Sequence, residues 1–483
     1  MLALLLSAAL SADHPHVVVI TVDDMNCDSI GAFGCEVPDI TPRIDGLVAE
    51  SLKFEHAHVQ VGNCMPSRNV LFSGLYPHQN GVEGFRQVEP AKARHLADDL
   101  SAAGYYCAIR GKESHSTPFT PYPAWDWVAP VRDADGQKVI KNAVTYGRNT
   151  ATAIQAAADA GKPLFLSVNV SDPHKPFWTE VRKGDPKPDP FRPSRVYSAG
   201  EVTVPGFLPD DPAVREELAL YYSSVRRADD CVGAILDAVA DAGVAGETLL
   251  VFLSDHGMPL PFAKTQLYHH STRTPLLVRW PGRVEPGVDG THMVSAVDFT
   301  PTVLEVLGVE PGRAFEGRSF APLLRGESQE GRDFVVKTYY ENSGRYRQPM
   351  RGIESREGLY LFNPWSDGQA VFKHAPAGTR TYKRMQQLAK TDPAVAARLD
   401  LLDHRRLEEL YRLPEDRDCL DDVADDPAAA GLKRRLQADL EAWMVANDDP
   451  MLDAFRNRDD ERAVAEYMAS QPDLRRKQAK KRK

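Results

Sequence analysis

The chain has 483 residues, of which 42% are hydrophobic and 26% are charged, and its formal net charge is −10 at pH 7. This composition is typical of a globular protein, and the length suffices for one large domain and a smaller one. The negative balance argues against nucleic-acid binding through the whole surface, so a site for an anion must be built locally.

The first residues, "MLALLLSAALSA", form an apolar stretch that is too short to span a bilayer and ends in small residues. The pattern predicts a secretory signal over residues 1–12, although no basic segment precedes it. A plain N-terminal core segment or a misassigned start is the alternative. We therefore expect an exported protein without a membrane span.

A strand and a helix open the folded part. "HVVVITV" (16–22) is a β-branched run, and Thr41 and Pro42 provide the N-cap and first turn of a helix that extends towards Leu52. The same alternation recurs, with helices near 93–103, 149–160 and 212–242 and strands near 105–109, 163–170, 248–253 and 274–280. Alternating strands and helices predict an α/β domain with a mostly parallel sheet.

Polar residues follow four of these strands where each strand ends. They are Asp23 and Asp24, Gly111 and Lys112, "SDPH" (171–174) and "SDHG" (254–257). Each group alone also fits an ordinary turn or helix cap. Because the carboxyl ends of parallel strands share one edge, where such folds bind ligands, we expect the four groups to converge on one site.

Three carboxylates would meet in that site, from Asp23, Asp24 and Asp255. They would repel one another unless a cation neutralised them, so a divalent metal is predicted. Oxygen ligands favour Ca²⁺, with Mg²⁺ as the second choice, over zinc. His256 is a softer ligand than an amide oxygen, which leaves the identity of the metal more open than its presence.

Basic side chains are expected around the same metal: Arg68, Lys112, His115, His174 and Lys264. They would make a locally positive pocket for a small tetrahedral oxyanion, and both phosphate and sulfate fit. A helix over 66–74 would begin beside the anion and add backbone N–H groups.

Cys64 stands just before that helix, and the interpretations that keep it as an ordinary thiol are weak. A cysteine-dependent phosphatase needs an arginine six residues on, where this chain has Val70. A plain thiolate is also a poor ligand for Ca²⁺. The six cysteines form neither a zinc-binding pattern nor a disulfide framework, and no bridge between Cys27 and Cys35 is expected.

The segment "CMPSRNVLFSG" (64–74) resembles the signature C-x-P-S-R-x-x-L-x-[ST]-G of the sulfatase family. The resemblance covers most of the chain, through "VVVITVDDMN", "TPRIDGLVAESLKFEHAH", "VDFTPTVLEVLGV" and "EELYRLPED". It implies an alkaline phosphatase-like α/β sandwich, with a large, mostly parallel central sheet flanked by helices. It also implies a smaller C-terminal α+β domain with an antiparallel sheet.

The resemblance further implies that a maturation enzyme converts Cys64 to formylglycine, whose hydrated aldehyde is the nucleophile, with Asp255 as its base. The implied metal ligands are Asp23, Asp24, Cys64, Asp255 and His256. Arg68 and Lys112 would orient the formylglycine and hold sulfate oxygens, assisted by His115. His174 and Lys264 would contact the sulfate, and one of them would protonate the leaving atom.

Two positions depart from the pattern of the family. The element "GKESH" has the spacing K-x-x-H where some relatives have K-x-H, which makes the role of His115 less firm than that of Lys112. His256 stands where many sulfatases have asparagine, although others have histidine.

Within the family, "SDHGMPLPFAKTQLYHHSTRTPLLV", "GLYPHQNGV" and "QPMRGIES" resemble the heparan N-sulfatase (sulfamidase) branch. The implied reaction removes an N-sulfate from glucosamine at the non-reducing end of a heparin-type saccharide. Three alternatives stay open: an O-sulfatase acting on another glycan, a phosphodiesterase or phosphonate hydrolase of the same superfamily, and a non-catalytic polyanion-binding protein.

The expected organisation is a catalytic domain over 13–331, a C-terminal subdomain over 332–455 that walls the pocket, and a charged, flexible tail over 456–483 that ends in a basic run. Arg351 is a predicted contact for a carboxylate or hydroxyl of the saccharide, with a surface salt bridge as the alternative. The sequon at Asn169 lies in a predicted strand and is taken as chance. The oligomeric state stays open, with a dimer as one option.

Overall fold

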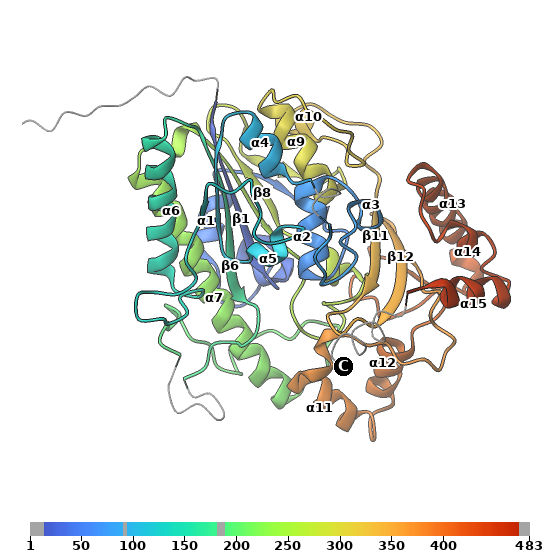
Figure 1. Ribbon diagram of the computed structural model, residues 1–483. Coiled ribbons are helices and arrows are strands. Elements are labelled where there is room, and N and C mark those ends of the chain that lie inside the picture. The colour runs from blue at the N-terminus through green and yellow to red at the C-terminus, as the bar shows by residue number, and fades with distance from the viewer. Residues whose placement is uncertain (1–13, 90–93, 181–188, 473–483) are drawn as a thin grey trace, which may run out of the picture.

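The computed structural model describes residues 14–89, 94–180 and 189–472. Its centre is an eight-stranded sheet (Figure 1). In spatial order the strands are β5 (Trp127–Val128), β4 (Tyr106–Arg110), β6 (Leu164–Pro173), β1 (His16–Asp23), β7 (Thr248–Ser254), β8 (Leu276–Arg279), β2 (Leu52–Phe54) and β9 (Gly287–Asp289). Short strands β3 (Ala57–His58) and β10 (Val294–Ser295) form a separate pair.

The predicted mostly parallel sheet is confirmed. Strands β5, β4, β6, β1 and β7 run parallel, as do β2 and β9, whereas β8 is antiparallel to both of its neighbours. Strand β8 corresponds to "TPLLVRW", whose direction the apolar run could not reveal.

Both faces of this sheet are covered, because side chains of β1 alternate between two hydrophobic cores. Val18 and Ile20 pack in the core under α1 (Pro42–Val48), α6 (Ala143–Asp159) and α7 (Pro212–Asp241). Val17 and Val19 pack in the core under α4 (Leu96–Ala102) and α9 (Phe299–Val306), beside which α10 (Ala321–Leu324) lies. The sandwich predicted from the resemblance is therefore present.

Four further helices belong to the large domain: α2 (Cys64–Ser73), α3 (Pro77–Asn80), α5 (Glu113–Ser116) and α8 (His269–Thr272). Helix α2 begins at Cys64, two residues earlier than predicted. Helix α6 begins at Ala143 rather than near residue 149.

A four-stranded antiparallel sheet makes up the core of the C-terminal part, as predicted. Its order is β11 (Phe334–Glu341), β12 (Arg347–Ser355), β13 (Leu359–Phe362) and β14 (Glu408–Tyr411). One face packs against α13 (Ala430–Ala446) and α14 (Leu452–Arg456), and the other face packs on the large domain through Met350 and Leu361. Helices α11 (Arg380–Leu388) and α12 (Pro393–His404) complete this part.

The prediction of a flexible tail over 456–483 needs correction. Helix α15 (Glu461–Ser470) occupies part of it, because Asp460 caps the helix by accepting from the N–H of Arg462, and Val464 is buried. The basic run at 475–483 and the predicted signal at 1–12 lie outside the described residues. The boundaries at 331 and 455 remain predictions.

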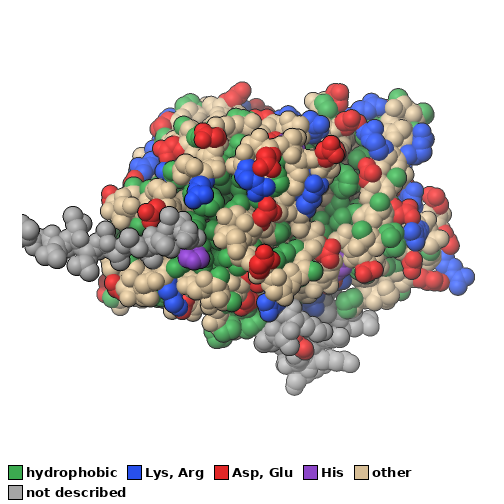
Figure 2. All heavy atoms as spheres, turned by 90° about the horizontal axis from the view of Figure 1, so that it is seen from above, with side chains coloured by type: hydrophobic (Ala, Val, Ile, Leu, Met, Phe, Trp, Pro, Cys, Tyr) green, Lys and Arg blue, Asp and Glu red, His purple; other side chains and the backbone are tan. Residues whose placement is uncertain are grey.

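No helix within the described part of the chain is long and apolar enough to cross a membrane. All six cysteines are described and free, so Cys27 and Cys35 form no bridge. Figure 2 shows one face of the molecule, on which Lys and Arg side chains lie among Asp and Glu rather than forming one continuous basic surface.

Candidate active site

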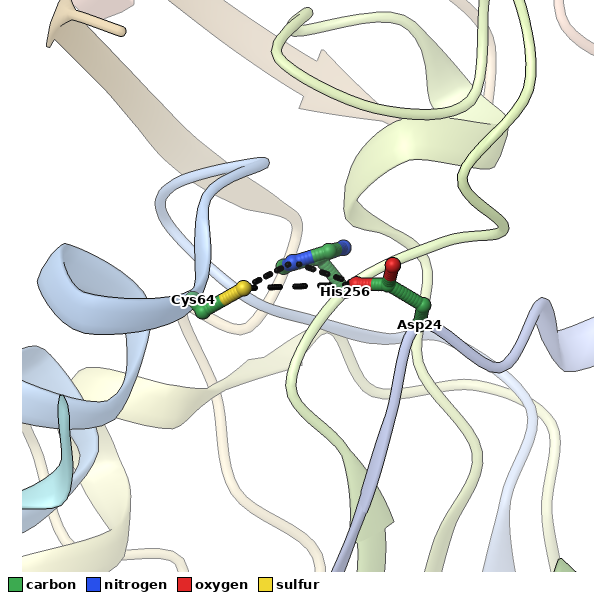
Figure 3. A group of neighbouring side chains, drawn as sticks. All are labelled: Asp24, Cys64 and His256. Carbon is green, nitrogen blue, oxygen red and sulfur yellow. Dashed lines mark hydrogen bonds and ion pairs between the residues drawn. The ribbon is translucent and has the colours of Figure 1, made fainter. Parts of the chain in front are cut away.

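Cys64 is the first residue of α2 and is almost completely buried. Its Sγ lies 3.3 Å from His256 Nε2 and 4.0 Å from Asp24 Oδ1 (Figure 3), and 3.9 Å from Lys264 Nζ. Burial alone would raise the pKa of Cys64, but the charges of Lys264 and His256 hold it well below its ordinary value. The N-terminus of α2 also favours negative charge at this position.

The carboxylates reach Cys64 because two central strands run side by side. Strands β1 and β7 pair in parallel with Val22 opposite Ser254, so Asp23 and Asp24 leave the sheet beside Asp255. The backbone N–H of Asp24 donates to Asp255 Oδ1 at 3.0 Å. The predicted convergence of separate strand ends is therefore seen directly.

His256 presents one defined nitrogen to this group. Its Nδ1 lies 3.0 Å from the carbonyl oxygen of Gly257, which turns Nε2 towards Cys64 and to within 3.2 Å of Asp24 Oδ1. A ring nitrogen held in this way orients the other nitrogen for metal binding. Burial would lower the pKa of His256, but Asp255 and its other negatively charged neighbours raise it to about 9.

The donor set fits a divalent cation. Ligand atoms of Asp24, Cys64 and His256 lie within 4.8 Å of one another, and so do those of Asp23, Cys64 and Asp255. Burial raises the pKa of Asp255 to about 8 against the opposing effects of His256 and Arg68. The two groups share Cys64, and their carboxylates are buried and close together. A cation bound between them would neutralise this negative charge.

Arg68 lies one helical turn beyond Cys64, on the same side of α2, and is buried. Its Nε donates to Asp255 Oδ2 at 3.0 Å and its Nη2 to Asp23 Oδ1 at 3.3 Å. Its Nη1 donates to the side-chain oxygen of Asn169. Arg68 therefore joins strands β1, β6 and β7 to the helix that carries Cys64.

The two predicted lysines each pair with one carboxylate. Lys112 pairs with Asp23, and Lys264 Nζ donates to Asp24 Oδ1 and Oδ2 at 2.6 and 2.7 Å. Lys112 follows Gly111, whose φ is +76° and where a Cβ would come within 2.8 Å of the Asn169 carbonyl oxygen. The turn thus needs glycine to aim Lys112 into the site.

His115 and His174 lie on the more open side. The side chain of His174 is 37% exposed, and its Nδ1 lies 2.6 Å from the Lys175 carbonyl oxygen while its Nε2 lies 4.0 Å from Asp24 Oδ2. His115 is partly buried and is the least of the neighbours that lower the pKa of the Cys64 thiol. His115 lies in the short helix α5, whose N-cap is Lys112.

Arg351 does not lie among the residues around Cys64. It is fully buried, and its Nε and Nη2 donate to Asp449 at 2.6 and 3.1 Å, with further bonds to Tyr340 and the Met350 carbonyl oxygen. An enclosed guanidinium with all of these bonds cannot receive a saccharide, so the predicted substrate contact does not stand. The structure does show a salt bridge of Arg351, but it lies in the core and not at the surface, as the alternative had it.

Sequence reasoning missed several supporting residues. Asn169 is fully buried and donates to the Gly111 carbonyl oxygen at 3.0 Å, so its side chain is a framework element and not a glycan acceptor. Lys141 Nζ donates to Asp172 at 2.7 Å and to the His174 carbonyl oxygen at 2.6 Å, which supports the loop that carries His174. Only the position of Asn169, two residues before "SDPH", could have pointed to such a role.

Comparisons with known proteins agree with this geometry. A model of the family "Sulfatase" matches residues 15–309, and a model described as "N-sulphoglucosamine sulphohydrolase, C-terminal" matches residues 255–370. The N-sulphoglucosamine sulphohydrolase of Homo sapiens is 30% identical over 93% of each chain. An endo-4-O-sulfatase of Bacteroides thetaiotaomicron is 26% identical, with 83% of this chain and 91% of that protein covered.

The fold also matches that of solved structures. The phosphonate monoester hydrolase of Agrobacterium radiobacter superposes with a TM-score of 0.66 at 17% identity, over 90% of this chain and 96% of the other. That identity supports the shared architecture alone. The family model and the human relative go further, and they show that the chain belongs to the sulfatase family, the hydrolases of sulfate esters and sulfamates.

Proposed function

We propose that the protein hydrolyses the N-sulfate of glucosamine at the non-reducing end of a heparin-type saccharide. The match of residues 255–370 to the C-terminal model of N-sulphoglucosamine sulphohydrolases supports this substrate, as does the alignment with the human enzyme over 93% of both chains. The observation that carries the chemistry is the position of Cys64 at the start of α2, among three carboxylates, two imidazoles and two lysines.

Cys64 would act after conversion to formylglycine by a maturation enzyme, and its hydrate would supply the hydroxyl that attacks sulfur. A divalent cation, for which we propose Ca²⁺, would be held by Asp23, Asp24, Asp255 and His256 beside residue 64 and would neutralise the charge of the sulfate. His256 is the one nitrogen donor in an oxygen-rich set, which fits Ca²⁺ less well than an amide would.

The remaining steps belong to this chain's own residues. Asp255 would take the proton of the attacking hydroxyl, and Arg68, whose Nε donates to Asp255 Oδ2, would keep that carboxyl aligned. Lys112 and Lys264 would leave their carboxylate partners to hold sulfate oxygens, with His115 beside them.

His174 is better placed than Lys264 to protonate the leaving nitrogen. Its side chain is 37% exposed on the side open to a saccharide, whereas that of Lys264 is only 8% exposed. The hydrogen bond at Nδ1 leaves Nε2 facing the site. This assignment refines the expectation that either residue could be the acid.

A second candidate is hydrolysis of an O-sulfate, because the endo-4-O-sulfatase aligns with 83% of this chain. The shared architecture of a phosphonate monoester hydrolase keeps phosphonate and phosphate diester hydrolysis as a third activity to assay. A polyanion-binding protein without turnover would carry Cys64 unmodified.

The test combines the mass of the tryptic peptide that contains Cys64 with sulfate release from N-sulfated and O-sulfated glucosamine. We expect a formylglycine mass and N-sulfate turnover, which Cys64→Ala abolishes and the control Cys35→Ala preserves. Cys35 is free, and no site residue contacts its thiol in the described part of the chain. O-sulfate turnover alone would refute the substrate, and an unmodified Cys64 in protein from the native host would refute the mechanism.

The apolar start of the sequence supports one further part of the proposal. We propose that the enzyme is exported, which would bring it to extracellular or compartment-enclosed saccharides. Edman sequencing of the purified protein from its host should begin near residue 13.

A further inference from the structure

A cavity of about 490 Å³ lies between the large domain and the C-terminal sheet. The large domain contributes Lys53, His56 and Arg273 to its lining, and the C-terminal part contributes Arg356, Leu413 and Arg417. None of the residues that line it belongs to the group around Cys64. Ligand sites are common at domain interfaces, and this volume is within their usual range.

The charged groups in and beneath the cavity are mostly paired with one another. The pairs are Lys53 with Glu55 at 3.3 Å, Arg273 with Asp28 at 2.5 Å, and Lys337 with Glu354. Arg356 and Arg417 are different, because both are exposed and neither side chain has a hydrogen bond or ion pair within the described residues. The cavity therefore carries two uncompensated positive charges in a chain whose net charge is −10.

Glu354 does not offset these charges, because a buried cluster already satisfies it. Its carboxylate accepts from Lys337 Nζ, and it lies 2.8 Å from His269 Nδ1 and 3.3 Å from His58 Nε2. The two imidazoles and the carboxylate are close enough to share a metal ion. Lys337 already occupies one oxygen, so we assign the cluster to charge neutralisation beneath the cavity.

The walls of the cavity are partly apolar. Phe33, Met293 and Leu413 line it, and each of them is at most 9% exposed. At the rim, the planar forks of two free arginines match the paired oxygens of sulfate and carboxylate groups.

We propose that this cavity is a second, non-catalytic site for an acidic saccharide, with Arg356 and Arg417 as its anchors. The inference rests on the proposed function for the class of ligand, since that function makes acidic saccharides the molecules that the enzyme meets. The cavity would hold part of a sulfated saccharide at a distance from the sugar whose sulfate is hydrolysed.

The test uses the full chain with Cys64→Ala, which binds without turnover. Isothermal titration with a heparin hexasaccharide compares this protein with the same protein carrying Arg356→Ala and Arg417→Ala. The control carries Arg148→Ala and Arg462→Ala, which remove equal charge from exposed positions on α6 and α15. Hydrogen exchange reports where the saccharide lies, through peptides that cover 354–356 and 413–417.

We expect the cavity variant to bind about tenfold or more weakly for each arginine lost, whereas the control keeps its affinity. Protection of the two peptides should appear with the hexasaccharide and vanish in the cavity variant. The proposal is overturned if the cavity variant and the control variant bind the hexasaccharide with equal affinity. It is also overturned if inorganic sulfate alone binds as tightly as the hexasaccharide and depends on the same two arginines, because the cavity would then be an anion site without saccharide recognition.

Failure of the proposed function is seen separately. With Cys64 intact, Arg356→Ala and Arg417→Ala should leave N-sulfate release from monomeric glucosamine unchanged. Absence of that release in the parent protein refutes the substrate but leaves arginine-dependent hexasaccharide binding as support for the cavity.

Discussion

Replacing Arg351 with methionine tests whether this residue holds the C-terminal part together or binds substrate. Methionine keeps most of the aliphatic stem but removes the two hydrogen bonds to Asp449 and the bond to Tyr340. Asp449 is 4% exposed and would become a buried carboxylate without its counter-charge. Breaking a buried pair in this way costs about 3–5 kcal/mol in the free energy of unfolding.

A double-mutant cycle separates the pair from its surroundings. Asp449→Leu removes the stranded charge, although it also removes the acceptor for the Met451 N–H, a bond of 2.8 Å that is worth about 1 kcal/mol. We therefore expect the double variant to be more stable than Arg351→Met alone. Urea unfolding measures the stabilities, and sulfate release gives kcat and KM in parallel. An unchanged free energy of unfolding together with a raised KM would refute the assignment of Arg351 to the core.

Three further outcomes follow from the site and its supports. Asn169→Ala should lower kcat/KM by roughly 10- to 100-fold because Arg68 loses one of its three acceptors, and Asn169→Asp should retain more activity. Equal loss in both variants would exclude this positioning role. Dialysis against a chelator should abolish sulfate release and lower the Tm, and Ca²⁺ should restore both. At a concentration one hundred times its Kd, Ca²⁺ should raise the free energy of unfolding by about 2.7 kcal/mol. Activity that survives the chelator would contradict the metal site. Burial would lower the pKa of His270, but Asp28 and Asp418 raise it to about 9, above the ordinary 6.5. The stability that protonated His270 contributes is fully present below about pH 6.5 and is lost as the pH rises through 9. In His270→Gln, the free energy of unfolding should therefore fall less between these two pH values, by at most about 3 kcal/mol. Urea unfolding at several pH values measures the difference. An equal fall in the free energy of unfolding in the parent protein and in His270→Gln would contradict this role of His270.

The alternation of strands and helices could be predicted from local pattern alone. Glycines after α4, α6 and α7 adopt the left-handed conformation that ends a helix, at Gly104, Gly161 and Gly243, and each stands where the sequence placed it. Local pattern could not show that β8 is antiparallel, because a short apolar run carries no direction. The helix α15 was missed because a charged segment with one buried valine looks like a solvated tail.

The residue types around Cys64 were also readable in advance, since their chemistry is local to short motifs. Their distances were not, because they depend on the register of β1 against β6 and β7. Asn169 is the clearest example of a contact that the sequence does not reveal. Its side chain links Arg68 to the turn at Gly111, whereas in the sequence Asn169 is only the first residue of a sequon within a predicted strand.

Sequence by itself determined the family, the order of the elements and the chemistry of the residues that follow the strands, because motif and periodicity are properties of neighbouring residues. Tertiary structure alone decided which charges meet. It placed Arg351 in the core against Asp449 and brought Lys264 onto Asp24. It also left Arg356 and Arg417, at a cavity between domains, without a partner among the described residues. These pairings join residues up to 240 positions apart, and only the packing of sheets and helices sets their distances.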